Sequence, residues 1–219
     1  MTESNHQPTL SKEQIDSVIK LYSNGQYQEA IDQIKALNEI HPNVPFLFNL
    51  IGACYKAIGQ LKGAVKMFET AVSMKPEYAE AHKNLGITLR DLGQMDEALK
   101  SLNQAISAEP NYVDAHYNLA IILKDLNHFD DAVQSYYKVI EIDPNFAQAH
   151  NNLGNLLKGL GRFNDAVESF EKSIKISSNF AEAHNNYGNL LANLGRLDDS
   201  INSFKKAIEI NPNLSLIHI

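Results

Sequence analysis

Residues 147–180 read AQAHNNLGNLLKGLGRFNDAVESFEKSIKISSNF, and residues 181–214 read AEAHNNYGNLLANLGRLDDSINSFKKAIEINPNL. The two stretches have the same length, and most of their apolar, glycine and asparagine positions coincide. The same period extends toward the N-terminus, because prolines recur at this spacing, at Pro42, Pro76, Pro110, Pro144 and Pro212. Ser178 occupies the one position in this series where proline is missing. A fixed period of roughly 34 residues is typical of a repeat protein.

Within one unit the apolar residues follow helical spacing twice, before and after Gly161. The first run is Leu153, Leu156, Leu157 and Leu160, and the second is Phe163, Ala166, Val167, Phe170 and Ile174. The pattern predicts two helices joined by a tight turn. Glycine suits a turn that needs a left-handed backbone, and asparagine is the next best residue for that position. Small residues such as Gly154 should let the helices approach closely, and large ones such as Phe170 should fill the groove.

The composition describes an acidic chain without a disulfide. Of its 219 residues, 19 are Lys or Arg and 26 are Asp or Glu, which gives a formal net charge of −7. This charge argues against nucleic acid as the main partner, because phosphate binding requires clustered basic residues. Cys54 is the only cysteine. The polar N-terminus does not resemble a secretory signal, and the most apolar stretch, residues 44–61, contains Lys56 and is no bilayer span. We therefore expect a cytoplasmic protein.

The repeating residues resemble the tetratricopeptide repeat family, whose pattern is W-x2-L-G-x2-Y, then A-x3-F, then P. One unit matches it as His82-x2-Leu85-Gly86-x2-Leu89, Ala98-x3-Leu102 and Pro110; a second matches as His150-x2-Leu153-Gly154-x2-Leu157 and Ala166-x3-Phe170. Histidine mostly replaces the family's tryptophan. The resemblance covers residues 11 to 214 and implies an all-α fold, a right-handed α-solenoid (superhelix) of helix-turn-helix units with a 34-residue period.

In this register the chain has an N-terminal tail, 1–10, which we expect to be disordered, and six units: 11–44, 45–78, 79–112, 113–146, 147–180 and 181–214. The first unit matches the pattern least and resembles a terminal cap, with Ser11 and Gln14 placed to form a capping box. Residues 215–219 would begin a seventh first helix that stops after about one turn. Two interpretations remain open: the chain is a fragment of a longer protein, or its apolar end pairs with a second copy.

The sequence contains no recognisable catalytic motif, so we expect residues 1–219 not to be an enzyme and to need no cofactor. One histidine recurs per unit, at His82, His116, His150, His184 and His218. Stacked helices lie about 8–10 Å apart, whereas zinc ligands must converge within about 2 Å of one point. We therefore expect these histidines to pack between helices and to bind no metal. Cys54 occupies a position that is mostly apolar in the other units, so we expect its side chain to be buried and to fill space in the core.

Asparagines form the most informative column. In the tetratricopeptide repeat family the first helix of each unit lines the concave surface, and the column just before the Leu-Gly pair faces into that groove. By resemblance to the repeats of O-GlcNAc transferases, this asparagine ladder would bind the backbone of an extended peptide through its amides. The alternative is that the amides bond one another and tie the units together. The amide positions are Asn84, Asn118, Asn151, Asn152, Asn155, Asn185, Asn186, Asn189 and Asn193.

A second column on the same helices is basic: Lys56, Arg90, Lys124 and Lys158. Together with Lys83 it would place positive charge beside the groove and favour an acidic segment or a C-terminal carboxylate. Tyr117 would add an apolar contact. The alternative is a solvated helix end, where cations are stabilised by the helix dipole.

Three functions are therefore compatible with the sequence. The first is a non-catalytic scaffold that binds an extended peptide or partner segment in the concave groove. The second is the substrate-recruiting arm of a longer transferase whose catalytic domain lies beyond residue 219. The third is a self-assembling scaffold that forms homo-oligomers through residues 200–219. The expected partner in the first two cases is a protein or peptide, and neither nucleic acid nor membrane insertion is expected.

Overall fold

The structure is a computed structural model that describes residues 10–213. The predictions made for residues 1–9 and 214–219, the N-terminal tail and the start of a seventh first helix, lie outside the described residues. The described residues form twelve helices: α1 (Lys12–Ser23), α2 (Tyr27–Ile40), α3 (Pro45–Ala57), α4 (Leu61–Met74), α5 (Ala79–Asp91), α6 (Met95–Ala108), α7 (Val113–Asp125), α8 (Phe129–Ile142), α9 (Ala147–Gly159), α10 (Phe163–Ile176), α11 (Ala181–Asn193) and α12 (Leu197–Ile210).

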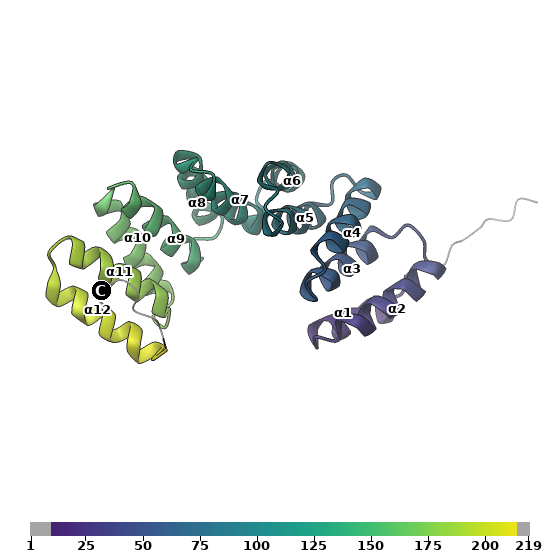
Figure 1. Ribbon diagram of the computed structural model, residues 1–219, viewed down its shortest axis with the longest axis horizontal. Coiled ribbons are helices and arrows are strands. Elements are labelled where there is room, and N and C mark those ends of the chain that lie inside the picture. The colour runs from purple at the N-terminus through teal and green to yellow at the C-terminus, as the bar shows by residue number, and fades with distance from the viewer. Residues whose placement is uncertain (1–9, 214–219) are drawn as a thin grey trace, which may run out of the picture. The chain divides into compact units, whose positions relative to one another are not determined.

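The helices pack as sequential pairs, as Figure 1 shows, so the predicted all-α arrangement of helix pairs is confirmed. The chain divides into two compact units, residues 1–115 and 116–219, and the division falls within α7. In the first compact unit α1 packs against α2, α3 against α4, and α5 against α6. In the second, α9 packs against α10 and α11 against α12. None of the described helices combines the length and the apolar character needed to cross a bilayer.

The turn inside each pair has the left-handed backbone that the sequence predicts. Gly161 adopts φ +73°, and Asn127, which replaces glycine between α7 and α8, adopts φ +62°. The amide of Gly161 donates to the carbonyl of Lys158, and the next amide donates to Leu157, which closes the end of α9. This local geometry reverses the chain and lets the second helix return along the first.

The core of each pair forms where a small residue of the first helix faces a large residue of the second. Phe170 of α10 is fully buried against Gly154 of α9. A Cβ at Gly154 would lie 2.9 Å from the Phe170 ring, so only glycine permits this approach without a shift. Gly86 faces Leu102 in the same way, at 2.8 Å. The predicted division between small and large columns is therefore confirmed for these pairs.

Two further sequence predictions concern single residues. Ser11 and Gln14 form the predicted capping box, because the Ser11 hydroxyl accepts from the Gln14 amide at 3.2 Å and the Gln14 side chain accepts from the Ser11 amide at 2.8 Å. Cys54 is fully buried in the first compact unit. Burial raises the pKa of its thiol to about 11, which keeps the thiol protonated and makes it a poor nucleophile.

Candidate functional site

In each compact unit the candidate site lies on the first helix of each pair, which means α3 and α5 in the first unit and α7, α9 and α11 in the second. We call these helix surfaces the first-helix surface. Neighbouring first helices are joined there by side-chain hydrogen bonds between residues 35 positions apart. The Nδ2 of Asn84 donates to the Oδ1 of Asn49 at 3.0 Å, and the Nδ2 of Asn186 donates to the Oδ1 of Asn151 at 3.0 Å. The Nδ2 of Asn152 donates to the hydroxyl of Tyr117 at 2.8 Å. These bonds correspond to one period plus one residue, so each repeat meets the next with an offset of one position.

Asn151 is buried, with 1% of its surface exposed. Its oxygen accepts from Asn186, and its Nδ2 donates to the carboxylate of Glu182 at 3.2 Å. The amide therefore ties α9 to α11. Asn49 makes the matching contact in the first compact unit, where it is 4% exposed and its Nδ2 lies 3.4 Å from the hydroxyl of Tyr78. Sequence reasoning did not single out Asn49, although the same offset that joins the other pairs separates it from Asn84.

Aromatic rings support the amides of the candidate site. The Tyr117 ring lies edge-on to Tyr136 with centroids 6.1 Å apart, and 4.9 Å from the ring of Phe146. This packing fixes the Tyr117 hydroxyl that accepts from Asn152. In the first compact unit, the ammonium of Lys83 lies 5.6 Å from the centroid of Tyr112, a cation–π contact.

The basic column differs between the two compact units. In the first unit one carboxylate serves two cations, because Asp91 lies 3.1 Å from the ammonium of Lys56 and 3.1 Å from the guanidinium of Arg90. The Lys56–Asp91 pair has the same one-position offset as the amide pairs. The acidic side chain thus offsets the positive charge that the sequence places here.

In the second compact unit this compensation is weaker. Lys124 lies 3.5 Å from its sequence neighbour Asp125, and both side chains are largely exposed. Lys158 makes no ion pair with any described residue. Asp91 lies 35 positions after Lys56, and the residues at the same offset from Lys124 and Lys158 are the uncharged Gly159 and Asn193. Burial lowers the pKa of the Lys158 ammonium. The second compact unit therefore presents two cations without a strong protein counter-ion.

Hollows adjoin the column in both compact units. In the first unit a hollow of about 380 Å³ is lined by Tyr22, Ala53, Lys56, Ala57, Phe68 and Asn84. In the second a hollow of about 240 Å³ is lined by Lys124, Phe129, Asn155, Leu156, Gly159 and Leu160. Each combines an apolar floor with one basic residue and one asparagine amide. This combination is typical of a site that orients a ligand through a few polar groups.

The remaining asparagines of the candidate site are more accessible. Asn118, Asn155, Asn185 and Asn189 are half-buried, and Asn193 is exposed. Within residues 10–213 the side chains of Asn155, Asn185, Asn189 and Asn193 make no hydrogen bond to another residue. The amides therefore divide into those engaged between repeats and those available to a ligand.

The histidine column has a structural function that the sequence did not specify. The Nε2 of His82 lies 2.8 Å from the carbonyl of Pro76, that of His150 lies 3.1 Å from the carbonyl of Pro144, and that of His184 lies 3.0 Å from the carbonyl of Ser178. Each histidine thus binds the turn six residues before it, which joins one pair to the next. Burial is the main cause that lowers the pKa of His150, and the charge of Lys172 acts in the same direction. The hydrogen bond to the carbonyl of Pro144 acts in the opposite direction.

Comparisons with protein-family models identify the repeat. Tetratricopeptide repeat models match residues 57–105 and 145–211, and a model described as TPR repeat matches residues 88–127 and 122–161. Together the matched segments extend from residue 57 to residue 211. Among curated proteins, anaphase-promoting complex subunit 3 of Dictyostelium discoideum is 35% identical over 65 residues. That segment spans 30% of this chain and 7% of the relative.

Solved structures with the same arrangement of helices are numerous. A crystal structure of MamA is 25% identical, with a TM-score of 0.69 over 74% of this chain and 95% of that chain. YrrB, described as a TPR protein with an unusual peptide-binding site, is 20% identical, with a TM-score of 0.67 over 84% and 94%. PilF of Pseudomonas aeruginosa is 14% identical, with a TM-score of 0.83 over 93% of each chain. At such low identities, the likenesses to YrrB and PilF establish the fold alone.

Proposed function

Since this chain belongs to the tetratricopeptide repeat family of protein-interaction modules, we propose that its first-helix surface binds an extended, acidic peptide segment of a partner protein without catalysing a reaction. The observation that carries the proposal is the hollow of about 240 Å³ between Lys124 and Asn155. It joins a weakly compensated cation, a free amide and the apolar side chains of Phe129, Leu156 and Leu160 at one place.

Charge favours an acidic ligand at the second compact unit. Asp91 offsets two cations in the first unit, whereas Lys124 and Lys158 have no comparable partner. A carboxylate of the ligand would supply the missing counter-ion. Lys158 is partly buried, which lowers its pKa because burial disfavours the charged ammonium. A ligand carboxylate beside Lys158 should stabilise this ammonium.

The amides favour a ligand with an extended backbone. Asn155 and Asn189 occupy the same column in consecutive repeats, and neither is engaged with another described side chain. A free amide has two N–H donors and a carbonyl acceptor, so it can donate a hydrogen bond to the C=O of a peptide group and accept one from the N–H. The engaged amides, such as Asn152, keep spare hydrogen-bonding capacity and are held in place by their partners. A preorganised row of this kind lowers the cost of ordering the side chains on binding.

Binding of acidic peptides to the full chain tests the proposal. The probes are acetyl-(Gly-Glu)4-amide, acetyl-(Gly-Gln)4-amide and acetyl-(Gly-Lys)4-amide, titrated by nuclear magnetic resonance. We expect the Glu peptide to shift amide signals of α7, α9 and α11 and to bind roughly tenfold more tightly than the Gln peptide, with the difference shrinking at high salt. The Lys peptide should bind most weakly. Equal affinity for all three probes would contradict an acidic ligand.

Two variant sets separate the charges from the amides in the same titration. Lys124→Ala with Lys158→Ala should abolish most of the preference for Glu over Gln. Asn155→Ala with Asn189→Ala should weaken the binding of both peptides by about 1–3 kcal/mol, since each of the two lost hydrogen bonds is worth about 0.5–1.5 kcal/mol. Asn164→Ala, at an exposed position of α10, is the matched control and should change nothing.

A second function, self-association, is supported by the exposed apolar side of α12. Leu197 is 62% exposed, Ile201 50% and Ile208 42%, whereas Val133, which matches Ile201 two repeats earlier, is 2% exposed. We expect Ile201→Lys with Ile208→Lys to raise the dissociation constant of a dimer at least about tenfold in analytical ultracentrifugation. Ile19→Lys, at a 41% exposed position of α1, is the control. A wild-type chain that stays monomeric at high concentration would refute this function.

The transferase-arm hypothesis stays a prediction. YrrB is described as a TPR protein with a peptide-binding site, and the curated relative as a subunit of a complex. The match to the repeat family supports an interaction module.

A further inference from the structure

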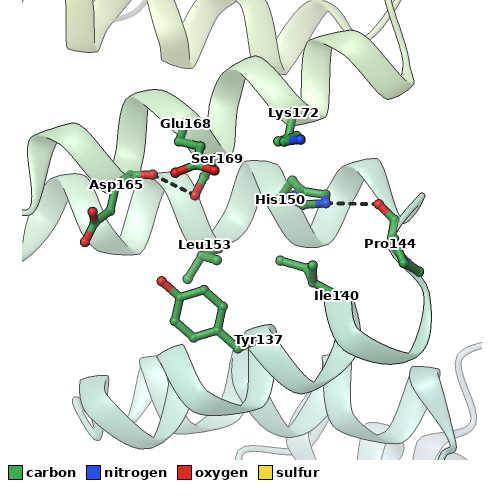
Figure 2. A pocket seen from close by; sticks show the side chains of 9 residues that line it. All are labelled: Tyr137, Ile140, Pro144, His150, Leu153, Asp165, Glu168, Ser169 and Lys172. Atoms are coloured by element: carbon green, nitrogen blue, oxygen red, sulfur yellow. Dashed lines mark hydrogen bonds between the residues drawn. The ribbon is translucent and has the colours of Figure 1, made fainter.

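A separate hollow of about 330 Å³ lies between two second helices, α8 and α10, and shares no residue with the hollow beside Lys124. Figure 2 shows Tyr137 and Ile140 of α8 on one side, Glu168 and Lys172 of α10 on the other, and Leu153 and His150 of α9 between them. We call this hollow the α8–α10 groove. One wall is thus apolar, the opposite wall is charged, and the floor is formed by buried side chains.

Tyr137 is unusual for its position. It is 41% exposed, and the residues in the same column of the other repeats are all polar: Lys35, Glu69, Asn103, Glu171 and Lys205. An exposed tyrosine beside an apolar hollow is among the residue types that contribute most to protein interfaces. Its ring and Ile140 form the apolar wall, next to the buried Leu153 of the floor. The fourth repeat therefore exposes an aromatic ring at a position that is polar in the other repeats.

The charged wall is open to a ligand at two of its residues. Asp165 is already engaged, because the guanidinium of Arg162 holds it at 2.7 Å and 2.9 Å. Glu168 and Lys172 form no ion pair with each other or with any other described residue. They lie four residues apart on α10, so their positions differ by about 6 Å along the helix axis.

We infer that the α8–α10 groove binds an extended peptide in which an apolar residue lies between a basic and an acidic one, in one of the two possible orders. In an extended chain, alternate side chains point the same way and lie about 6.6–6.8 Å apart. The two charged residues of the ligand would therefore reach Glu168 and Lys172 together, each opposite its counter-charge. The central residue would point the other way, toward Tyr137 and Ile140. This charge and polarity pattern selects a partner peptide of a different kind from the uniformly acidic one proposed for the first-helix surface.

Three short peptides test this inference on the full chain. They are acetyl-Ser-Lys-Leu-Glu-Ser-amide, its reversed form acetyl-Ser-Glu-Leu-Lys-Ser-amide, and acetyl-Ser-Lys-Ser-Glu-Ser-amide, which lacks the apolar residue. In magnetic-resonance titrations, one of the first two should shift signals of α8 and α10 with a dissociation constant of about 1 mM, as expected for so small a ligand. The other direction and the Ser-centred peptide should each bind at least about threefold more weakly.

Charge reversal provides the decisive variant. Glu168→Lys with Lys172→Glu should exchange the preference between the two peptide directions, because the counter-charges change places while the apolar wall is kept. Both side chains are exposed, so this variant should fold normally. Tyr137→Glu, which installs the residue type found at position 69, should weaken the preferred peptide about fivefold. Ile19→Glu, at a 41% exposed position of α1 outside the groove, is the matched control.

Several outcomes would overturn the inference. These are equal binding of the three peptides, no binding by any of them, or an unchanged direction preference in the charge-reversed variant. Shifts confined to α7, α9 and α11 would also overturn it, and would instead place these peptides at the first-helix surface. Because the two hollows share no lining residue, failure here leaves the test with Glu-containing peptides intact.

Discussion

Replacing Phe170 by alanine is expected to lower the free energy of unfolding by about 3–5 kcal/mol. The ring is fully buried between α9 and α10 and lies against Gly154, which has no side chain that could move into the space left behind. The variant therefore loses both the transfer free energy of the ring and the contacts of its neighbours. Urea denaturation followed by circular dichroism measures the effect. Hydrogen exchange of α9 and α10 should locate it, because repeat arrays can unfold locally.

Phe163→Ala is the matched control for this prediction. Phe163 lies at the start of the same helix but is 41% exposed, so its truncation should cost less than about 1 kcal/mol. If both variants lost the same stability, close packing against Gly154 would not be what holds this pair together. A small effect of Phe170→Ala alone would mean that the neighbouring helices collapse into the cavity.

Replacing Asn151 by alanine is expected to cost about 1–3 kcal/mol of stability. Asn151 is the most deeply buried of the candidate-site asparagines, and it both accepts from Asn186 and donates to Glu182. Its removal leaves two polar groups of α11 without their partner. The same urea denaturation measures the loss of unfolding free energy. The rate of hydrogen exchange should increase most at the backbone amides of α11.

Asn189→Ala is the control for the same residue type on the neighbouring helix. Its amide makes no hydrogen bond to another described residue, so this variant should keep its stability and lose peptide affinity instead. The two variants thus separate the two functions of the asparagines. Comparable stability of both would show that the bond between repeats contributes nothing, and would return Asn151 to the set of ligand contacts.

The local structure could be predicted from residue types because it depends on short-range rules. Helical spacing, the turn at Gly161, its substitute Asn127 and the capping box at Ser11 all follow from the conformational preferences of a few adjacent residues. The fixed period then repeats each result along the chain. Burial of Phe170 and Cys54 follows from the same columns, since a helix has one face toward its partner.

The properties of the candidate site could be predicted only in part. The sequence placed asparagines and cations on the first helices, and the structure brings Asn151 to Asn186 and Lys56 to Asp91 by the same offset. That offset, one position beyond the period, depends on how neighbouring helices are rotated against each other. The pattern within a single helix does not contain this information. The difference between engaged amides and free amides, such as Asn155, therefore could not be foreseen.

The sequence by itself determined that this protein is a chain of helix pairs with a repeating division between small and large residues in the core. Only the tertiary structure decided which polar groups are used between repeats, where Lys124 is left without a strong counter-ion, and that Tyr137 and Lys172 face each other across one groove. The physical reason is the range of the interactions. Backbone preferences and helical burial act within a few residues, whereas side-chain hydrogen bonds and ion pairs depend on atomic positions in neighbouring helices.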